Sequence, residues 1–305
     1  MFDTTELAPE SEMGRYSIKE VETLSGIKAH TLRIWEQRYN ILKPKRTDTN
    51  IRYYTDEQLR LILNISTLNR SGYKISRIAS MRPEQMREEV LKVEISRDEP
   101  DFLMDSLVRS MLDFDELHFE KILQNAILKM GFEQAFIRLI FPFLVRTGVM
   151  WQAGSVKVVQ EHFISNLIRR KICAAIDSVY VQPGADSKRF VLFLPENETH
   201  ELLLLFTDYL LRKKNHHVVY LGCSLPMTEL PFIATKFKPD YLVTYLTVPL
   251  ESGTLNNYIK RIAAMLPECK FLIGGSQITL SKVVLPERCI AIQSAEELLQ
   301  AIEKG

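Results

Sequence analysis

The residues best suited to chemistry lie in the last third of the chain, where His200 follows Glu198 by two positions. A neutral imidazole is a good ligand for a first-row transition metal, and a nearby carboxylate can bind the second ring nitrogen and orient the ring. We therefore expect His200 to be a metal ligand that Glu198 positions. A single histidine at the start of a helix has an alternative interpretation, which is a purely structural role.

Small and hydroxyl-bearing residues of the same region stand at the ends of apolar runs. Thr244 lies near the end of one run, and Gly274 and Gly275 directly follow another. Such runs alternate with helical patterns and cover residues 190–194, 218–221, 241–245, 270–273 and 289–292. This alternation predicts a Rossmann-like open parallel sheet over residues 187–305, covered by helices on both faces. Because such sheets bind ligands at the carboxyl ends of their strands, we expect these residues to share a site with His200.

A second group of residues with a chemical role is the basic segment near the N-terminus. Residues 15–82 hold 14 lysines and arginines against 6 acidic residues, whereas the rest of the chain holds 25 against 32. The net charge of +1 therefore conceals a positive head on a negative body. Such asymmetry predicts that the head binds a polyanion.

The local pattern of the head predicts two short helices joined by a turn at Gly26. Ser17 and Glu20 have the spacing of a capping box, which begins the first helix. In the second helix, over residues 31–39, the apolar side chains share one face, with Trp35 in the core, and the arginines lie outside. Two helices around a glycine turn form a helix-turn-helix, and the polar, basic loop that follows is expected to form a wing.

The motifs in residues 16–36 and 50–54 resemble the MerR family of transcription regulators. The resemblance implies a winged helix-turn-helix that binds double-stranded DNA, usually as a dimer. A recognition helix fits the major groove, where arginine pairs with guanine, and basic wing residues neutralise phosphates. The DNA contacts that the resemblance implies are Arg33, Arg38, Arg46, Arg52 and Tyr53. The alternative interpretation is a solvated basic face on a domain that binds something else.

The middle of the chain, residues 83–181, is predicted to be helical. Apolar residues recur at helical spacing in four segments, which Gly131 and Gly154 help to separate. Four such segments in a row favour an antiparallel four-helix bundle. Residues 182–186 are typical of a linker before the α/β region. The expected domains are a tail at 1–14, the winged head at 15–82, the bundle at 83–181 and the sheet domain at 187–305.

The α/β region resembles the cobalamin-binding domain, whose pattern is (Asp/Glu)-x-His-x-x-Gly, then Ser-x-(Leu/Thr), then Gly-Gly. Glu198 and His200 match the first element, and Thr244 stands in the place of the serine. Gly274 and Gly275 match the third element. The resemblance implies that His200 is the lower cobalt ligand and that Glu198 orients it. It also implies that the two glycines make room for the displaced nucleotide tail.

A signature in the bundle resembles the same family. Trp151, nine intervening residues, then Glu161 and His162 reproduce the helical cap of light-responsive cobalamin regulators of the CarH and LitR type. In those relatives the cap covers the upper face of the corrin and holds its adenosyl group. An aromatic plane and a carboxylate that accepts ribose hydroxyls suit a nucleoside. The implied cofactor is cobalamin, with adenosylcobalamin as a candidate form; the alternative is a bundle-core tryptophan beside surface residues.

Two positions depart from the family pattern. Leu203 stands where the pattern has glycine, and its branched side chain takes space that a cofactor tail or corrin edge would use. Gln152 stands where the best-known photosensing members have a histidine that captures cobalt, and an amide is a poor cobalt ligand. The alternative hypothesis is therefore a MerR-type regulator whose degenerate, cobalamin-free C-terminal module serves oligomerisation or partner binding.

Composition narrows the remaining classes of function. With 46% apolar and 25% charged residues the chain is typical of a globular protein, and its apolar runs are too short to cross a bilayer. Four scattered cysteines without CxxC spacing argue against disulfides or a thiolate metal sensor, so we expect a cytoplasmic protein. No Ser-His-Asp set, phosphate loop or zinc motif is visible, so we expect no enzyme.

These patterns together predict a transcription regulator that binds operator DNA as a homo-oligomer, either a dimer or a tetramer. Cobalamin in the C-terminal module would change self-association, with light as the usual trigger in the family that the chain resembles. Linked heads gain through effective concentration, so a modest change in assembly becomes a large change in operator occupancy.

Overall fold

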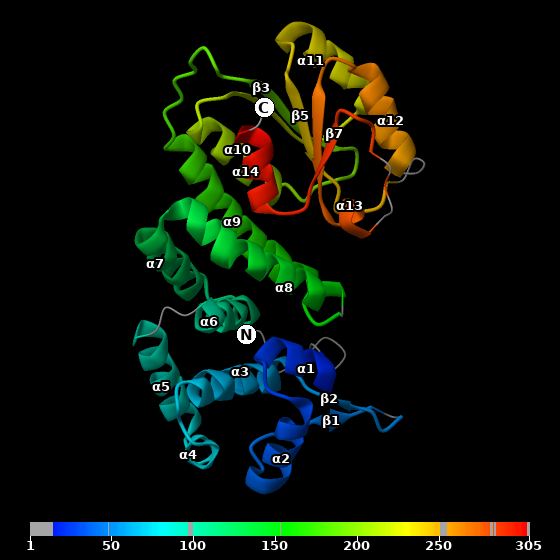
Figure 1. Cartoon of the computed structure of the whole chain (residues 1–305). Coiled ribbons are helices and arrows are strands. Elements are labelled where there is room, and N and C mark those ends of the chain that lie inside the picture. The colour runs from blue at the N-terminus through cyan, green and yellow to red at the C-terminus, as the bar shows by residue number, and fades with distance from the viewer. Residues whose placement is uncertain are drawn as a thin grey trace, which may run out of the picture. The chain divides into compact units, whose positions relative to one another are not determined.

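The computed structural model describes residues 15–47, 49–96, 100–152, 154–250, 255–280, 283 and 285–303 (Figure 1). The predicted tail at residues 1–14 lies outside these ranges. The chain divides between Leu167 and Ile168 into two compact units. In the described part of the chain, no helix is long and apolar enough to span a membrane.

The N-terminal unit begins with the predicted helix-turn-helix. Helix α1 (Ile18–Ser25) begins at the capping box, in which Ser17 Oγ accepts the Glu20 N–H at 3.3 Å and the Glu20 carboxylate accepts the Ser17 N–H at 2.6 Å. It ends at Gly26, whose φ of 71° is the left-handed conformation that glycine adopts at little cost. Helix α2 (Ala29–Tyr39) follows, with Trp35 buried as expected.

The wing is a two-stranded antiparallel ribbon of β1 (Lys45–Arg46) and β2 (Arg52–Tyr53). Helix α3 (Asp56–Arg70) begins at a second capping box, formed by Thr55 and Gln58, and α4 (Ile75–Ala79) completes the head. The predicted winged helix-turn-helix is therefore confirmed as a fold.

Helices continue through the middle of the chain. They are α5 (Pro83–Ser96), α6 (Pro100–Asp113), α7 (Glu116–Ala135), the π-helix η2 (Phe136–Ile140), α8 (Phe141–Gln152) and α9 (Val158–Asp177). The break predicted at Gly131 is a kink within α7, where this residue has φ 79° and ψ 159°. Aromatic side chains fill the space between helices, as where the Phe119 and Phe143 rings meet edge-on at 5.6 Å.

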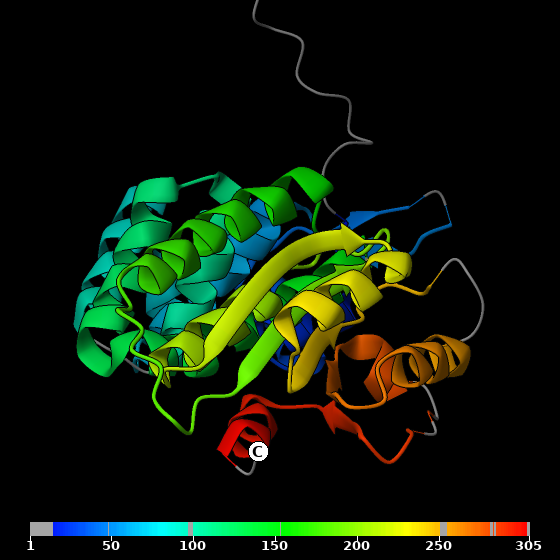
Figure 2. The ribbon, with the colours of Figure 1, turned by 90° about the horizontal axis from the view of Figure 1, so that it is seen from above.

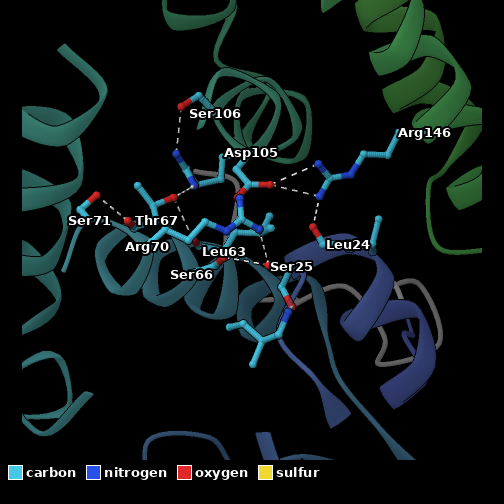
Figure 3. A network of polar contacts seen from close by, with 12 residues as sticks. Leu24, Ser25, Leu63, Ser66, Thr67, Arg70, Ser71, Asp105, Ser106 and Arg146 are labelled. Carbon is cyan, nitrogen blue, oxygen red and sulfur yellow. Dashed lines mark hydrogen bonds and ion pairs between the residues drawn. The ribbon is translucent and has the colours of Figure 1, made fainter. Parts of the chain in front are cut away.

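A buried carboxylate joins these helices to the end of α1 (Figure 3). Asp105 on α6 pairs with Arg70 of α3 at 3.4 Å and with Arg146 of α8 at 3.2 Å. Both guanidinium groups also donate to carbonyl groups in the last turn of α1: Arg70 to Ser25 at 2.6 Å, and Arg146 to Leu24. These carbonyls lie in the last turn, where a helix has no N–H partners of its own, so the arginines add to the cap that Gly26 provides.

The other end of α1 is held by the segment that follows α8. The Tyr16 hydroxyl donates to the Ser155 carbonyl at 2.7 Å, and the Ser155 hydroxyl donates to the Glu20 carboxylate at 2.9 Å. Since Glu20 belongs to the capping box, this contact ties the start of α1 to the start of α9. Helix α1 is thus bound at both ends to α8 and the residues after it, and the head packs with these helices as one unit.

Replacing Asp105 with asparagine is expected to destabilise this unit by about 3 kcal/mol, because both arginines lose the buried charge that compensates them. Urea unfolding followed by circular dichroism measures the change. The matched control is Asp113→Asn, since Asp113 is half-exposed and pairs with Arg60 at 2.7 Å. This exposed pair contributes roughly 0–1 kcal/mol. Equal losses in the two variants would contradict a structural role for the buried network.

The C-terminal unit contains a five-stranded parallel sheet in the order β4-β3-β5-β6-β7. Its strands are β3 (Arg189–Pro195), β4 (His217–Leu225), β5 (Tyr241–Tyr245), β6 (Lys270–Gly274) and β7 (Cys289–Ile292). All five predicted strands are therefore confirmed. The chain reverses direction across the sheet between β3 and β5, and ligands of open α/β sheets bind at the carboxyl ends of strands at such a switch point.

Helices cover both faces of this sheet (Figures 1 and 2). They are α10 (Leu202–Lys213) and α14 (Ala295–Glu303) on one face, and α11 (Leu230–Phe237) and α12 (Leu255–Met265) on the other. The short helices η3 (Met227–Glu229) and α13 (Ser276–Leu280) lie in connections. Leu242 and Leu246 of the β5 region pack with Ile259 and Ile262 of α12. Alternate residues of β5 therefore point toward α12, and the others toward α10.

Candidate nucleic-acid interface and metal site

The outer face of α2 carries exposed basic side chains. Arg33, Gln37 and Arg38 are all exposed, whereas Leu32 and Trp35 on the opposite face are buried. The two arginines are therefore exposed on α2, as the helical spacing predicted; their contact with DNA stays a prediction.

Each of the three predicted wing residues also contacts another side chain of the head. Arg46 donates to Asn50 across the turn of the wing at 2.7 Å, and the Arg15 guanidinium lies 5.2 Å from the centre of the Tyr53 ring. Arg52 pairs at 3.6 Å with Glu36 of α2, whose side chain is buried. An arginine has five N–H donors, so this pair leaves donors that can reach a phosphate.

Sequence reasoning did not find the role of Glu36. Its carboxylate accepts a hydrogen bond from the Tyr54 hydroxyl and also pairs with Arg52, so one residue of α2 holds the second strand of the wing. Burial and this hydrogen bond raise the pKa of Tyr54 above its ordinary value. Glu36 lies 16 residues or more before Arg52 and Tyr54 in the sequence. Only the contact between α2 and the wing therefore reveals that Glu36 holds the wing.

The predicted metal ligand lies in the loop between β3 and α10. His200 Nδ1 is 2.6 Å from Glu198 Oε1, and the His200 side chain is 52% exposed. The other oxygen of Glu198 accepts the backbone N–H groups of Thr247 and Val248 at 2.7 and 3.0 Å, just beyond β5. Glu198 therefore links the loop after β3 to the residues after β5 and holds the His200 imidazole at the carboxyl ends of these two strands.

The charge of Glu198 determines which ring nitrogen can bind a metal. Burial on its own raises the pKa of this carboxyl, but hydrogen bonds from the His200 ring and from three backbone N–H groups outweigh it and lower the pKa to about 2. The ionised carboxylate accepts a proton-bearing Nδ1, which directs the lone pair of Nε2 toward a metal. In this arrangement Nε2 of His200 would be the ring atom that binds a metal.

A further carboxylate stabilises the same loop. Glu201 accepts the Tyr220 hydroxyl proton at 2.7 Å and the Arg169 Nε–H at 2.5 Å. Arg169 belongs to the part of α9 that lies in the C-terminal unit. In the described residues, His, Cys, Asp and Glu side chains do not gather in groups of three or more that could hold a metal ion by themselves.

The structure places Thr244 away from the other predicted cofactor residues. Thr244 shares the face of β5 that Leu242 and Leu246 present to α12, whereas Tyr245 points toward α10 and Gly274. Side chains of a strand alternate, so a one-residue difference in register moves a side chain to the opposite face. The Thr244 hydroxyl is fully buried and has no hydrogen-bond partner among the described residues. The residue beside the glycine pair is Tyr245, and the prediction for Thr244 needs this correction.

The two glycines are closely packed by the chain itself. A Cβ atom on Gly274 would lie 2.7 Å from the Tyr245 ring, and one on Gly275 would lie 2.3 Å from the Leu246 carbonyl oxygen. Gly275 also has a φ of 101°, where other residues are strained. Glycine is thus required at both positions by the packing of the chain itself, and the ring of Tyr245 occupies the space beside Gly274.

The predicted cap residues lie near the end of the N-terminal unit. Trp151 is 52% exposed, which rules out the alternative of a bundle-core tryptophan. The Glu161 carboxylate accepts the Ser165 hydroxyl proton at 2.5 Å and lies 3.0 Å from Nδ1 of His162. The side chain of Gln152 lies outside the described residues.

Comparison with known proteins finds a family match for the N-terminal head and another for the helical middle of the chain. Residues 16–85 match the model of the MerR HTH family regulatory proteins, and residues 103–175 match that of the B12 binding domain. The chain is 24% identical to the HTH-type transcriptional repressor CarH of Myxococcus xanthus, over 92% of this chain and 96% of that protein. It is 28% identical to the repressor CarA of the same organism, over 73% of each.

A solved structure supports the fold of the helices and sheet. The monomethylamine corrinoid protein of Methanosarcina barkeri aligns over 67% of this chain and 96% of its own, with a TM-score of 0.51 and 12% identity. At that identity the likeness concerns the fold alone. The chain is therefore similar to MerR HTH regulators over residues 16–85, to the B12 binding domain over residues 103–175, and to two transcriptional repressors over most of its length.

Proposed function

We propose that this protein is a DNA-binding transcription regulator that binds cobalamin and changes its operator occupancy in response. The observation that carries the proposal is the Glu198–His200 pair, an oriented imidazole at the switch point of a parallel sheet. It occurs in a chain that also has a winged helix-turn-helix with exposed arginines. The regulatory names of the relatives favour this role over that of an enzyme.

On the DNA side, Arg33 and Arg38 of the recognition helix are proposed to enter the major groove. Arginine binds the O6 and N7 atoms of guanine through two parallel hydrogen bonds, which gives sequence discrimination. Arg46, Arg52 and Tyr53 of the wing are proposed to contact the phosphate backbone, where they add affinity that falls with salt. The DNA is double-stranded, and the bound form is proposed to be a homodimer or a tetramer.

On the ligand side, Nε2 of His200 is proposed to bind the lower face of the cobalt, with Glu198 as the positioning residue. When bound, adenosylcobalamin would supply a cobalt–carbon bond that light can break. Trp151, Glu161 and His162 are proposed to contact the adenosyl group through aromatic stacking and hydrogen bonds to ribose. Because the residue after Trp151 is glutamine, we expect no second strong protein ligand from that position.

The link between the two sites is proposed to be self-association. A ligand that favours one assembly changes how many heads can engage an operator, and linked heads bind far more tightly than single heads. The contacts that hold α1 at both ends fix the orientation of each head on its helical support. A change in assembly would therefore present the heads at a different spacing.

The proposal is tested by adding adenosylcobalamin to the purified protein in the dark under anaerobic conditions. Corrin absorbance that elutes with the protein in gel filtration, and a spectral change on illumination, are the expected results. Protein that stays colourless at saturating cofactor would refute cobalamin binding and leave the cobalamin-free regulator as the better hypothesis.

Replacing Glu198 with glutamine is expected to weaken corrinoid binding roughly 10- to 100-fold, as is typical when the group that orients a metal-binding histidine is lost. An amide keeps the size of the carboxylate but removes its charge and one of its two acceptor oxygens, so one set of the N–H groups that Glu198 binds also loses its acceptor. Absorbance titration gives the dissociation constant. The control is Glu196→Gln, an exposed position two residues earlier that should leave the constant unchanged. Equal affinities for the two variants would argue against a positioning role.

A further inference from the structure

We infer that this site takes a corrinoid whose nucleotide tail stays outside the sheet, so that burial of the tail contributes nothing to affinity. The inference rests on the proposed function, since it assumes that His200 binds a corrinoid. It concerns the groove beside Gly274, between α10 and the carboxyl ends of β5 and β6, where the chain's own side chains occupy the space.

The ring of Tyr245 fills the groove. A Cβ atom on Gly274 would lie 2.7 and 2.8 Å from two carbons of this ring, so the ring rests directly on the glycine. The ring is only 5% exposed. Its hydroxyl lies 2.8 Å from the Thr207 hydroxyl on α10, which in turn donates to the Leu203 carbonyl at 2.8 Å. The tyrosine thus spans from strand to helix and closes the gap between them.

The glycine pair has a sufficient explanation within the chain. The Leu246 N–H donates to the Gly274 carbonyl at 2.9 Å, and the Leu246 carbonyl accepts the Gln277 N–H at 3.0 Å. Any side chain on Gly275 would overlap the Leu246 backbone. Both glycines are therefore needed for the approach of β6 to the residue after β5, and they do not indicate an open cradle for a ligand.

Binding of the corrin ring does not require this groove. The His200 ring is half-exposed, and Glu198 is anchored to the N–H groups of Thr247 and Val248 rather than to α10. A nucleotide base is a bicyclic aromatic group larger than a phenol ring, so it cannot occupy the groove together with Tyr245. Leu203, at the start of α10, adds bulk at the same end of the helix.

The test compares two corrinoids on the full chain: aquocobalamin, which has the nucleotide tail, and diaquocobinamide, which lacks it. Absorbance titration gives a dissociation constant for each, and their ratio cancels the contribution of the ring. The cost of displacing the base of aquocobalamin from cobalt is the same for every variant, so it cancels when the ratios of two variants are compared. Tyr245→Ser should open the groove and raise the preference for cobalamin over cobinamide at least tenfold. Tyr245→Phe keeps the ring and should retain the wild-type ratio. An unchanged or reduced ratio in the serine variant would overturn the inference.

Two further outcomes keep the inference separate from the proposed function. If the serine variant does not fold, the wild-type ratio decides. Aquocobalamin must give up the bond between cobalt and its own base, so tighter binding of cobinamide would support the inference, and equal or tighter binding of cobalamin would overturn it. If neither corrinoid binds the wild-type protein, the proposed cobalamin binding fails, and the inference fails with it. If both bind with a preference for cobalamin, only the inference fails.

Discussion

Replacing His200 with alanine is expected to abolish measurable corrinoid binding. The imidazole would be the one protein ligand to cobalt, so its loss should cost more than the roughly 10- to 100-fold typical of groups that only orient a ligand. The absorbance change that accompanies histidine coordination should disappear as well. Titration of the purified variant with diaquocobinamide measures both effects, because this corrinoid has no base of its own that competes with histidine.

The control for this experiment is His217→Ala. His217 is exposed and begins β4, at the end of the sheet opposite to the carboxyl ends of the strands. Its replacement removes one histidine from the same unit and should leave binding unchanged. If His200→Ala binds corrinoid as tightly as the wild type, the cobalt ligand has been assigned to the wrong residue.

Replacing Arg33 with alanine is expected to weaken DNA binding by roughly 1–3 kcal/mol and to relax the preference for one base pair, as is typical of a bidentate contact with guanine. Arg46→Ala should instead weaken binding to all sequences about equally and reduce the slope of the salt dependence by about one. Fluorescence anisotropy with a duplex selected from a random pool, repeated at several salt concentrations, distinguishes the two effects.

A matched loss of charge elsewhere serves as the control. Arg87 is exposed on α5, outside the recognition helix and the wing, so Arg87→Ala should change affinity little beyond a small loss of general attraction. Equal losses for the Arg33 and Arg87 variants would indicate that net charge alone drives binding, and the assignment of α2 as the recognition helix would be wrong.

Local signals in the sequence predicted most of the fold. The capping boxes at Ser17 and Thr55 marked the starts of α1 and α3, and the five apolar runs marked the five strands. These features depend on neighbouring residues and on periodicity, so a single sequence contains them. Consecutive elements that are joined by short connections usually lie side by side, so the order of the predicted helices and strands was enough to predict the helix-turn-helix and the parallel sheet.

The candidate site was less predictable because it depends on side-chain direction. His200 and Glu198 are two residues apart, and their contact could be expected from spacing. Thr244 and Tyr245 are adjacent, so their side chains point to opposite faces of β5. Only the packing of Leu242 and Leu246 on α12 shows that Thr244 faces α12 and Tyr245 faces α10.

Contacts between residues that are far apart in the sequence could not be predicted from any local sequence pattern. The pairing of Asp105 with Arg70 and Arg146 joins residues from three helices, and Glu36 contacts Arg52 and Tyr54 across the wing. Neither arrangement has a local sequence pattern. The two compact units divide between Leu167 and Ile168, within α9, whereas the sequence predicted a boundary at the linker of residues 182–186.

The most direct test of the account measures DNA affinity with and without adenosylcobalamin in the dark, on the wild type and on His200→Ala. If cobalamin controls DNA binding through His200, the cofactor should change the affinity of the wild type at least tenfold and leave the variant unchanged, while both proteins bind the duplex in a salt-sensitive manner. A wild-type affinity that is the same with and without bound cofactor would contradict it.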